Sequence, residues 1–153
     1  MTLHFAEVTD AIASLDVEGL RIKDADEIPA QVGVRDSMLI PMPNIISDFS
    51  MERESFGGGS TAAMTVTYTV NYRLCFQPVT TSRVMTLGVF SDLMVMVGLI
   101  LDAVLVIDVF ISDYDTVVDI VPITVANMGI VNDPADNAFY GCDLSFRVQE
   151  QIN

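Results

Sequence analysis

A strict alternation of apolar and polar residues from Met64 to Phe76 constrains this chain most. The apolar positions are Met64, Val66, Tyr68, Val70, Tyr72, Leu74 and Phe76. Threonine, asparagine or arginine lies between them, with Cys75 as the one exception. Successive side chains of a β-strand point to opposite faces, so this pattern predicts a long strand with one buried face.

A very apolar helix is predicted to follow this strand. Thr81 or Ser82 is a suitable N-cap, and the helix is expected to run to about Val106. Apolar residues occupy nearly every direction around Leu87–Leu101. One face therefore packs in the core, and we expect a second face to be buried against a partner. The helix residues that we assign to a subunit interface are Met94, Met96 and Leu99.

The same segment raises the alternative of a membrane-spanning helix. A spanning helix needs about 20 apolar residues without interruption. Asp92 and Asp102 bracket only nine apolar or glycine positions, and Asp108 follows soon after. We therefore expect a buried helix and no membrane. No signal peptide is expected either, because Met1–Glu7 has neither a basic nor an apolar region of the required kind.

The remaining patterns predict a single α+β domain over residues 1–153. Leu3–Val17 has apolar residues at helical spacing, and Gly19 ends that helix. Further strands are predicted at Leu20–Lys23, Ser37–Pro43, Val117–Val131 and Tyr140–Ile152, of which the first two are short. Pro41 and Pro43 restrict the second of these to an edge or a strand end, and Pro122 indicates an edge or a bulge. We expect a mostly antiparallel or mixed sheet packed against the N-terminal helix and one long apolar helix.

A glycine-rich stretch lies within Asn44–Thr61, which we interpret as a loop. Three consecutive glycines have no side chains to pack and no fixed conformation, so we predict a flexible hairpin tip near residues 55–61. A phosphate-binding loop is the alternative, but the lysine and Ser/Thr of a Walker motif are missing. The loop residues that we assign to a contact with a neighbouring protein are Phe56, Gly57, Gly58 and Gly59.

Catalytic and metal-binding motifs are missing from the sequence. His4 is the single histidine, and we expect it at the surface rather than as a catalytic base. Asp113 and Asp115 could hold a hard cation, but a calcium loop needs more ligands and a glycine at its bend, so solvated loop charge is favoured. Cys75 and Cys142 lack zinc-site spacing and are expected as buried free thiols rather than a disulfide. No enzymatic activity, cofactor or metal is predicted.

The charge of the chain argues against nucleic-acid binding. Seven basic and 21 acidic residues give a net charge of −14. Binding to phosphates depends on lysine and arginine, so we expect no tight binding to DNA. A surface this acidic can instead line a passage to which DNA must not adhere.

The order of the predicted elements carries a resemblance to a known family. An acidic Asp-Glu-Ile-Pro turn at Asp26–Pro29 precedes an apolar Leu-Ile-Pro-Met-Pro strand at Leu39–Pro43. The glycine-rich loop, the long tyrosine-containing strand and the apolar helix follow, and Phe-Tyr-Gly-Cys-Asp-Leu-Ser-Phe-Arg-Val at Phe139–Val148 closes the set. From Leu3 to Gln149, this layout is similar to that of the tail-terminator and head–tail joining proteins of long-tailed bacteriophages.

The resemblance implies a structural virion protein, assembled in the bacterial host cytoplasm. Such proteins have an α+β domain and form a ring, usually of six subunits, at the head-proximal end of the tail tube. The implied partners are further copies of the chain and the phage tail-tube and neck proteins, and DNA would pass through the ring. The acidic residues that we expect to face that channel are Asp24, Asp26, Glu27, Asp113 and Asp115. The family has no catalytic residues to transfer to this chain.

Other functions stay open at this point. A neck stopper, head-completion protein or tail-tube subunit would share the same assembly logic. A small-molecule binding module, with a pocket between helix and sheet, belongs to a different class. An enzyme is the third alternative.

Overall fold

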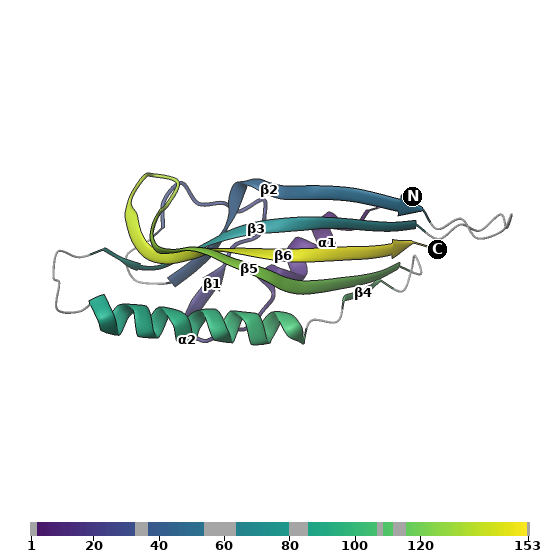
Figure 1. Ribbon diagram of the computed structural model, residues 1–153. Coiled ribbons are helices and arrows are strands. Elements are labelled where there is room, and N and C mark those ends of the chain that lie inside the picture. The colour runs from purple at the N-terminus through teal and green to yellow at the C-terminus, as the bar shows by residue number, and fades with distance from the viewer. Residues whose placement is uncertain are drawn as a thin grey trace, which may run out of the picture.

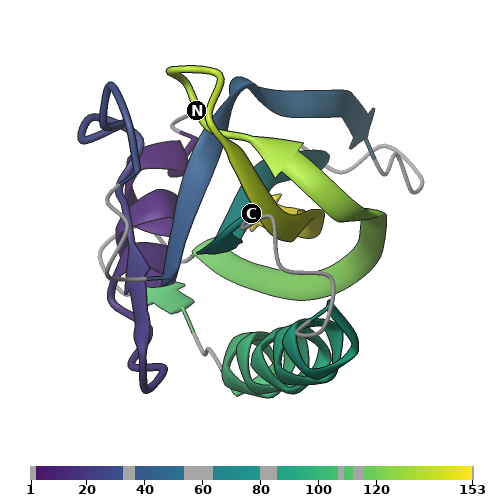
Figure 2. The same cartoon turned by 90° about the vertical axis from the view of Figure 1, so that its left-hand side faces the viewer.

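The computed structural model describes residues 3–32, 37–53, 64–79, 86–106, 109–111 and 116–152. A mixed six-stranded sheet, in the order β1-β2-β3-β6-β5-β4, curls as a half-barrel and packs against two helices (Figure 1, Figure 2). The elements are α1 (Phe5–Ala13), β1 (Leu20–Ile22), β2 (Ser37–Arg53), β3 (Met64–Pro78), α2 (Thr86–Leu105), β4 (Val109–Ile111), β5 (Thr116–Asn132) and β6 (Ala138–Ile152). The predicted α+β class and mixed sheet are confirmed.

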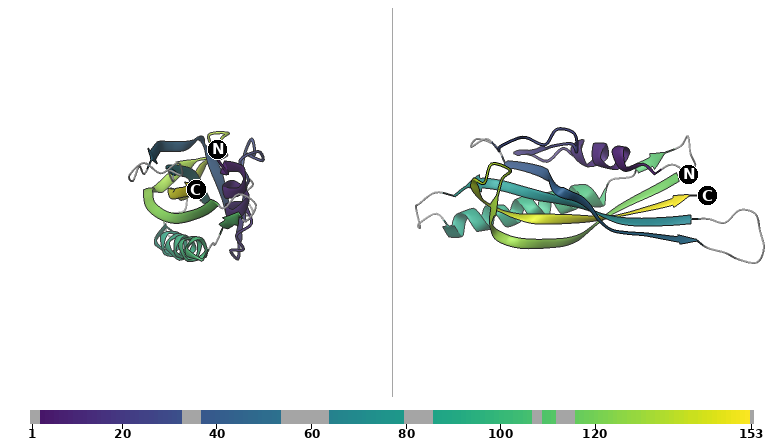
Figure 3. Two further views of the ribbon diagram at one scale, coloured as in Figure 1. Left: turned by 90° about the vertical axis from the view of Figure 1, so that its right-hand side faces the viewer. Right: turned by 90° about the horizontal axis from the view of Figure 1, so that it is seen from above.

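The long alternating strand forms the middle of the sheet. β3 pairs antiparallel with β2 on one side and with β6 on the other. Its apolar side chains face α1 and α2, which lie on the same side of the sheet (Figure 3). The buried β3 positions of this face are Val66, Tyr68, Val70, Tyr72 and Leu74. The predicted strand and its buried face are therefore confirmed.

The opposite face of β3 is more buried than the alternation predicts. Thr69 and Asn71 are both less than one-tenth exposed, and Cys75 is fully buried. Cys75 belongs to a second, smaller core with Val32 from the β1–β2 connection and Phe139 from β6. The curl of the sheet brings these segments over the end of β3, so one end of the strand is buried on both faces.

The two helices differ from their predicted bounds. α1 ends at Ala13, earlier than the predicted Val17, and its buried residues are Val8, Thr9 and Ile12. α2 ends at Leu105, within one residue of the prediction. The predicted N-caps of α2 lie outside the described residues.

The prediction for β2 is wrong in extent. The strand does not stop at Pro43 but continues to Arg53, where a loop was expected. β1 pairs with only the first three residues of β2. Beyond Leu39, the outer edge of β2 has no partner among the described strands. Pro41 and Pro43 lack a backbone N–H, but no described strand requires one from them on that edge. The β2–β3 ladder shifts register on either side of Ile46 and Ser47, so β2 is irregular in this part. The glycine-rich tip, with Phe56, Gly57, Gly58 and Gly59, lies outside the described residues.

The last two strands agree well with the sequence. β5 and β6 form an antiparallel hairpin, and the ladder shifts register between Pro122 and Thr124, where a bulge was one of two predicted outcomes. In the register of β3 and β6, Leu74 lies opposite Cys142, so Cys75 points to the other face of the sheet. Both cysteines are buried and free, as predicted. Burial raises the pKa of each thiol to about 12, which keeps both protonated at neutral pH.

Gly141 provides a test of the packing between β3 and β6. A Cβ at this position would overlap the carbonyl oxygen of Leu74 on the neighbouring strand. Because backbone atoms cannot rotate away, we expect Gly141→Ala to lower the free energy of unfolding by about 3 kcal/mol, the upper end of ordinary overpacking costs. Chemical denaturation measures this change.

Gly98 is the matched control. It lies within α2, and a Cβ there would meet nothing within 4 Å. Gly98→Ala is expected to raise the free energy of unfolding by up to about 1 kcal/mol, since alanine is the better helix former. Equal stability of the Gly141 variant and the wild type would contradict the close approach of the two strands.

Candidate functional site

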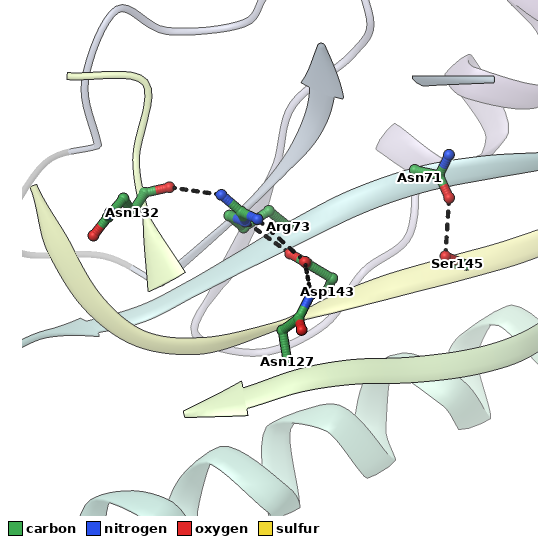
Figure 4. A network of polar contacts seen from close by, with 6 residues as sticks. All are labelled: Asn71, Arg73, Asn127, Asn132, Asp143 and Ser145. Carbon is green, nitrogen blue, oxygen red and sulfur yellow. Dashed lines mark hydrogen bonds and ion pairs between the residues drawn. The ribbon is translucent and has the colours of Figure 1, made fainter. Parts of the chain in front are cut away.

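A polar network crosses the sheet face that the helices leave uncovered (Figure 4). Arg73 of β3 forms a two-pronged ion pair with Asp143 of β6, with Nε–Oδ1 at 2.7 Å and Nη2–Oδ2 at 3.1 Å. Asn127, at a second register shift of β5 between Ala126 and Gly129, donates to Asp143 Oδ2 at 2.7 Å. Arg73 Nη1 also donates to the carbonyl of Asn132 at 3.2 Å. The network therefore ties β3, β6 and the end of β5 together.

The charges of this network remain fixed near neutral pH. Burial raises the pKa of Asp143, but the bonds from Arg73 and Asn127 outweigh it and hold that pKa below its usual value. The bond to Asp143 raises the pKa of Arg73 in turn. A carboxylate held in this way stays ionised and is engaged by its donors. The pair therefore acts as a structural clamp rather than as an acid or base.

Asn71 extends the network towards β2. Its amide nitrogen donates to the carbonyl of Asn44 at 2.9 Å and to Ser47 Oγ at 3.0 Å. Its amide oxygen accepts a bond from Ser145 at 2.9 Å. These bonds span the irregular part of β2, so the amide holds the bulged strand on the sheet.

A small pocket lies beside Arg73, between β2 and the turn that joins β5 to β6. Its volume is about 190 Å³. The lining is formed by Ile28, Ile40, Pro41, Met42, Pro43, Arg73, Asn132, Asp133 and Pro134. Asp133 holds the turn in place and accepts the amide of Val32 at 2.9 Å. The pocket is thus a feature of the strand ends, not the helix–sheet pocket expected of a binding module.

The expectation for His4 is wrong. The side chain is only 1% exposed, and it lies against Glu150, which is 0% exposed. The backbone N–H of His4 donates to Glu150 Oε1 at 2.9 Å, and Nδ1 lies 3.1 Å from the same oxygen. Tyr68 donates its hydroxyl to Glu150 Oε2 at 3.0 Å. Burial, followed by the charge of Glu150, raises the pKa of Tyr68.

This buried cluster was missed because its parts are far apart in the chain. His4 and Glu150 are separated by 146 residues. One signal was available: Glu150 occupies an inward position of the alternating C-terminal strand, between Val148 and Ile152. A carboxylate on an apolar face needs a buried donor, which predicts a polar partner without naming it.

The five acidic residues predicted to face a channel fall into three groups: two are exposed, one is paired, and two lie outside the described residues. Asp26 and Glu27 are exposed in the β1–β2 connection, as a channel surface requires. Asp24 instead pairs with Asp10 of α1. The hydrogen bond and charge of Asp24 raise the pKa of Asp10, whereas the hydrogen bond from Asp10 lowers that of Asp24. The remaining two, Asp113 and Asp115, lie outside the described residues. Within the described ranges, no group of three or more potential ligands could hold a metal ion.

The three α2 residues predicted at a subunit interface differ in their exposure. Met94 and Leu99 are exposed, but Met96 packs in the core of the domain. Met96 is therefore a core residue in this fold, contrary to its assignment. By length and composition alone, Gly88–Leu105 is apolar enough to cross a membrane, and 33% of it is buried within the domain.

Comparisons with known proteins give no relative. No protein-family model matches the chain, and no match was found among curated proteins or among solved structures. The function must therefore be inferred from the sequence and geometry of this chain.

Removal of the buried carboxylate tests the cluster around Glu150. Glu150→Ala leaves the amide of His4 and the hydroxyl of Tyr68 buried without their acceptor, so we expect it to cost about 3 kcal/mol. Tyr68→Phe removes one donor and keeps the others paired, and it should cost about 1 kcal/mol. Chemical denaturation of both variants gives the comparison. A smaller loss in Glu150→Ala than in Tyr68→Phe would contradict the cluster.

The Arg73–Asp143 pair predicts a dependence of stability on acid. The folded-state pKa of Asp143 lies below the unfolded value of about 3.9, so its contribution is complete above that pH and is lost as pH falls below it. The melting temperature of the wild type should therefore fall more between pH 5 and pH 3 than that of Asp143→Asn. Parallel pH profiles of the two proteins would contradict the lowered pKa.

Proposed function

We propose that this protein is a structural subunit of a bacteriophage virion. In this proposal it forms a ring that caps the head-proximal end of the tail tube and joins the tube to the neck, as the resemblance to tail terminators implies. The α+β fold, with one long helix on a mixed sheet, agrees with that expectation. The observation that carries the proposal is the uncovered apolar surface of α2.

The outer side of α2 is apolar and exposed. The exposed fractions on the helix are 65% for Met94, 62% for Val95, 45% for Leu99 and 63% for Leu105, and Val106, directly after the helix, is 80% exposed. The other side of the helix buries Leu93, Ile100 and Val104 completely. Exposed apolar surface of this kind typically marks a site of association.

A protein partner suits this surface better than a lipid one. Asp92 and Asp102 are both exposed on α2. A carboxylate is costly in the hydrocarbon of a bilayer but remains solvated at the rim of a protein interface. We therefore assign the outer side of α2 to a neighbouring subunit of the virion.

The charge distribution supports a channel through which DNA passes without sticking. Residues 3–32 contain seven acidic and two basic residues, a local charge of 2 − 7 = −5. Asp26 and Glu27 lie exposed in this segment. We propose that these two residues face the channel, where like charge keeps phosphates from adhering.

A small-molecule binding module is the second candidate, because the pocket beside Arg73 favours it. At about 190 Å³ it is smaller than the roughly 300–1,000 Å³ typical of drug-sized ligands. All residues that line this pocket come from one copy of the chain, so a monomeric mass in solution supports the binding module and a ring supports the structural subunit.

Charge placed on α2 tests the proposal. We expect native mass spectrometry of the wild type to show a ring, and cryo-electron microscopy of virions to place it at the tail end. A Met94→Asp/Leu99→Asp variant should keep its circular dichroism spectrum but lose the ring, because both side chains are exposed. A strict monomer that is also missing from virions would overturn the proposal.

Met96 supplies the matched control on the same helix. Its side chain is 8% exposed and lies in the main core. Met96→Asp buries an unpaired charge and should cost several kcal/mol of folding free energy, so this variant loses its folded spectrum as well. If Met96→Asp folds normally, the orientation of α2 described above is wrong.

A further inference from the structure

The sheet ends in two long strand edges without partners. β1 pairs with β2 only over residues 37–39, and β4 pairs with β5 only over residues 116–118. Beyond these short pairings, residues 40–53 of β2 and 119–132 of β5 have no outer partner among the described strands. Each edge therefore presents backbone N–H and C=O groups that are free to pair with another chain.

Charged residues, which usually protect such strands, are few on both edges and lie mainly at their ends. Residues 120–131 of β5 contain no charged side chain, and residues 40–51 of β2 contain only Asp48. Large apolar side chains are exposed on both strands. They are Ile46, Phe49 and Met51 on β2 and Val121, Val125, Met128 and Ile130 on β5. Monomeric proteins usually place lysine or other charges at long edges to prevent association, so these edges suit an assembled protein.

We propose that the β5 edge of one copy pairs with the β2 edge of the next copy, so that the sheets of neighbouring subunits join. The direction of the strands favours this contact. β2, β3, β6 and β5 are each antiparallel to the next, so β5 runs opposite to β2 within one sheet. When the next copy is turned about an axis parallel to the strands, its β2 meets β5 in the antiparallel orientation and continues the sheet.

The open parts of the β2 and β5 edges also lie at matching positions along the strand direction. Cyclic symmetry rotates copies without moving them along the axis, so each level of the sheet meets the same level of its neighbour. When the pairing is followed across the sheet from β2 through β3 and β6 to β5, Ser50 lies at the same position along the strand direction as Asp119. Pro41 lies in the same way at the position of Val125. Both of these stretches lie beyond the short strands β1 and β4. Pro41, Pro43 and Pro122 have no N–H to donate, so the other residues of the two stretches supply the donors of the contact.

This contact also brings α2 into the interface. α2 packs beside β5 along the lower side of the sheet in Figure 1. A neighbour joined to the β5 edge therefore lies close to the apolar helix described above. The inference rests on the proposed ring and identifies which surfaces of two copies form it.

Paired lysines on each edge test the contact. The β5 variant is Val121→Lys/Val125→Lys and the β2 variant is Ile46→Lys/Ser50→Lys, and all four native side chains are exposed. Gln149→Lys/Gln151→Lys adds the same charge at exposed positions of β6, inside the sheet. Native mass spectrometry should show the ring for the wild type and the β6 control, and the 16.7 kDa monomer for each edge variant.

A mixture of the two edge variants decides how the edges pair. Each variant keeps one intact edge, so equal amounts should give a complex of twice the monomer mass and no ring. If the β5 variant alone loses association while the β2 variant assembles as wild type, β5 pairs with β5 of a second copy and the proposal is overturned. Folded circular dichroism spectra of both variants ensure that the loss of mass reports the contact.

The proposal and the ring can fail separately. A wild-type ring that both edge variants leave intact would overturn the edge pairing and keep the proposed function. The wild type could instead form dimers or open chains and no ring. If both edge variants are then monomeric, the edge pairing is supported and the ring is overturned.

Discussion

The antiparallel ladder between β3 and β6 is the interaction on which the rest of the structure depends. It runs from Met64 opposite Ile152 to Pro78 opposite Phe139, so these two strands pair over nearly their whole length. Both helices pack against one face of this pair, and the Arg73–Asp143 clamp lies on the other. The remaining strands add outward from it, and the pairing becomes shorter and less regular towards both edges.

Several charged side chains are buried in this fold, and several large apolar side chains are exposed. Glu150 is fully buried and has donors from His4 and Tyr68, and Asp133 and Asp143 are also buried and bonded. Meanwhile the outer side of α2 and both edge strands expose large apolar side chains. A buried carboxylate with all its bonds made within the chain does not need a ligand. The large apolar side chains that remain exposed support the proposed role in association.

Strong negative charge opposes the proposed self-assembly, and in this fold the acidic segment 3–32 lies apart from the proposed contact edges. Like charges on neighbouring copies repel, and a chain of net charge −14 has that cost in every assembly. The acidic residues of the segment 3–32 lie on the α1 side of the molecule, whereas the two open edges hold almost none. The proposed contact through strand edges with few charges would join copies while the acidic surface of this segment stays in water.

The sequence by itself determined the elements whose pattern is local. The alternation of β3 and of β6 specified both strands and their inward faces, because a period of two is readable over a few residues. The composition around Leu93 indicated a long helix, and the isolated positions of Cys75 and Cys142 indicated free thiols. Each of these properties depends on neighbours in the chain.

Only the tertiary structure decided which surfaces these elements use. A helix that is apolar on all sides has no periodic signal, so packing alone turned Met96 into the core and Met94 outward. Asp10 and Asp24 met because α1 lies beside the β1–β2 connection. His4 is buried against Glu150, 146 residues away, and its N–H supplies a donor to that carboxylate inside the apolar layer. Such contacts are set by the sheet's long-range pairing, which no local pattern in the sequence records.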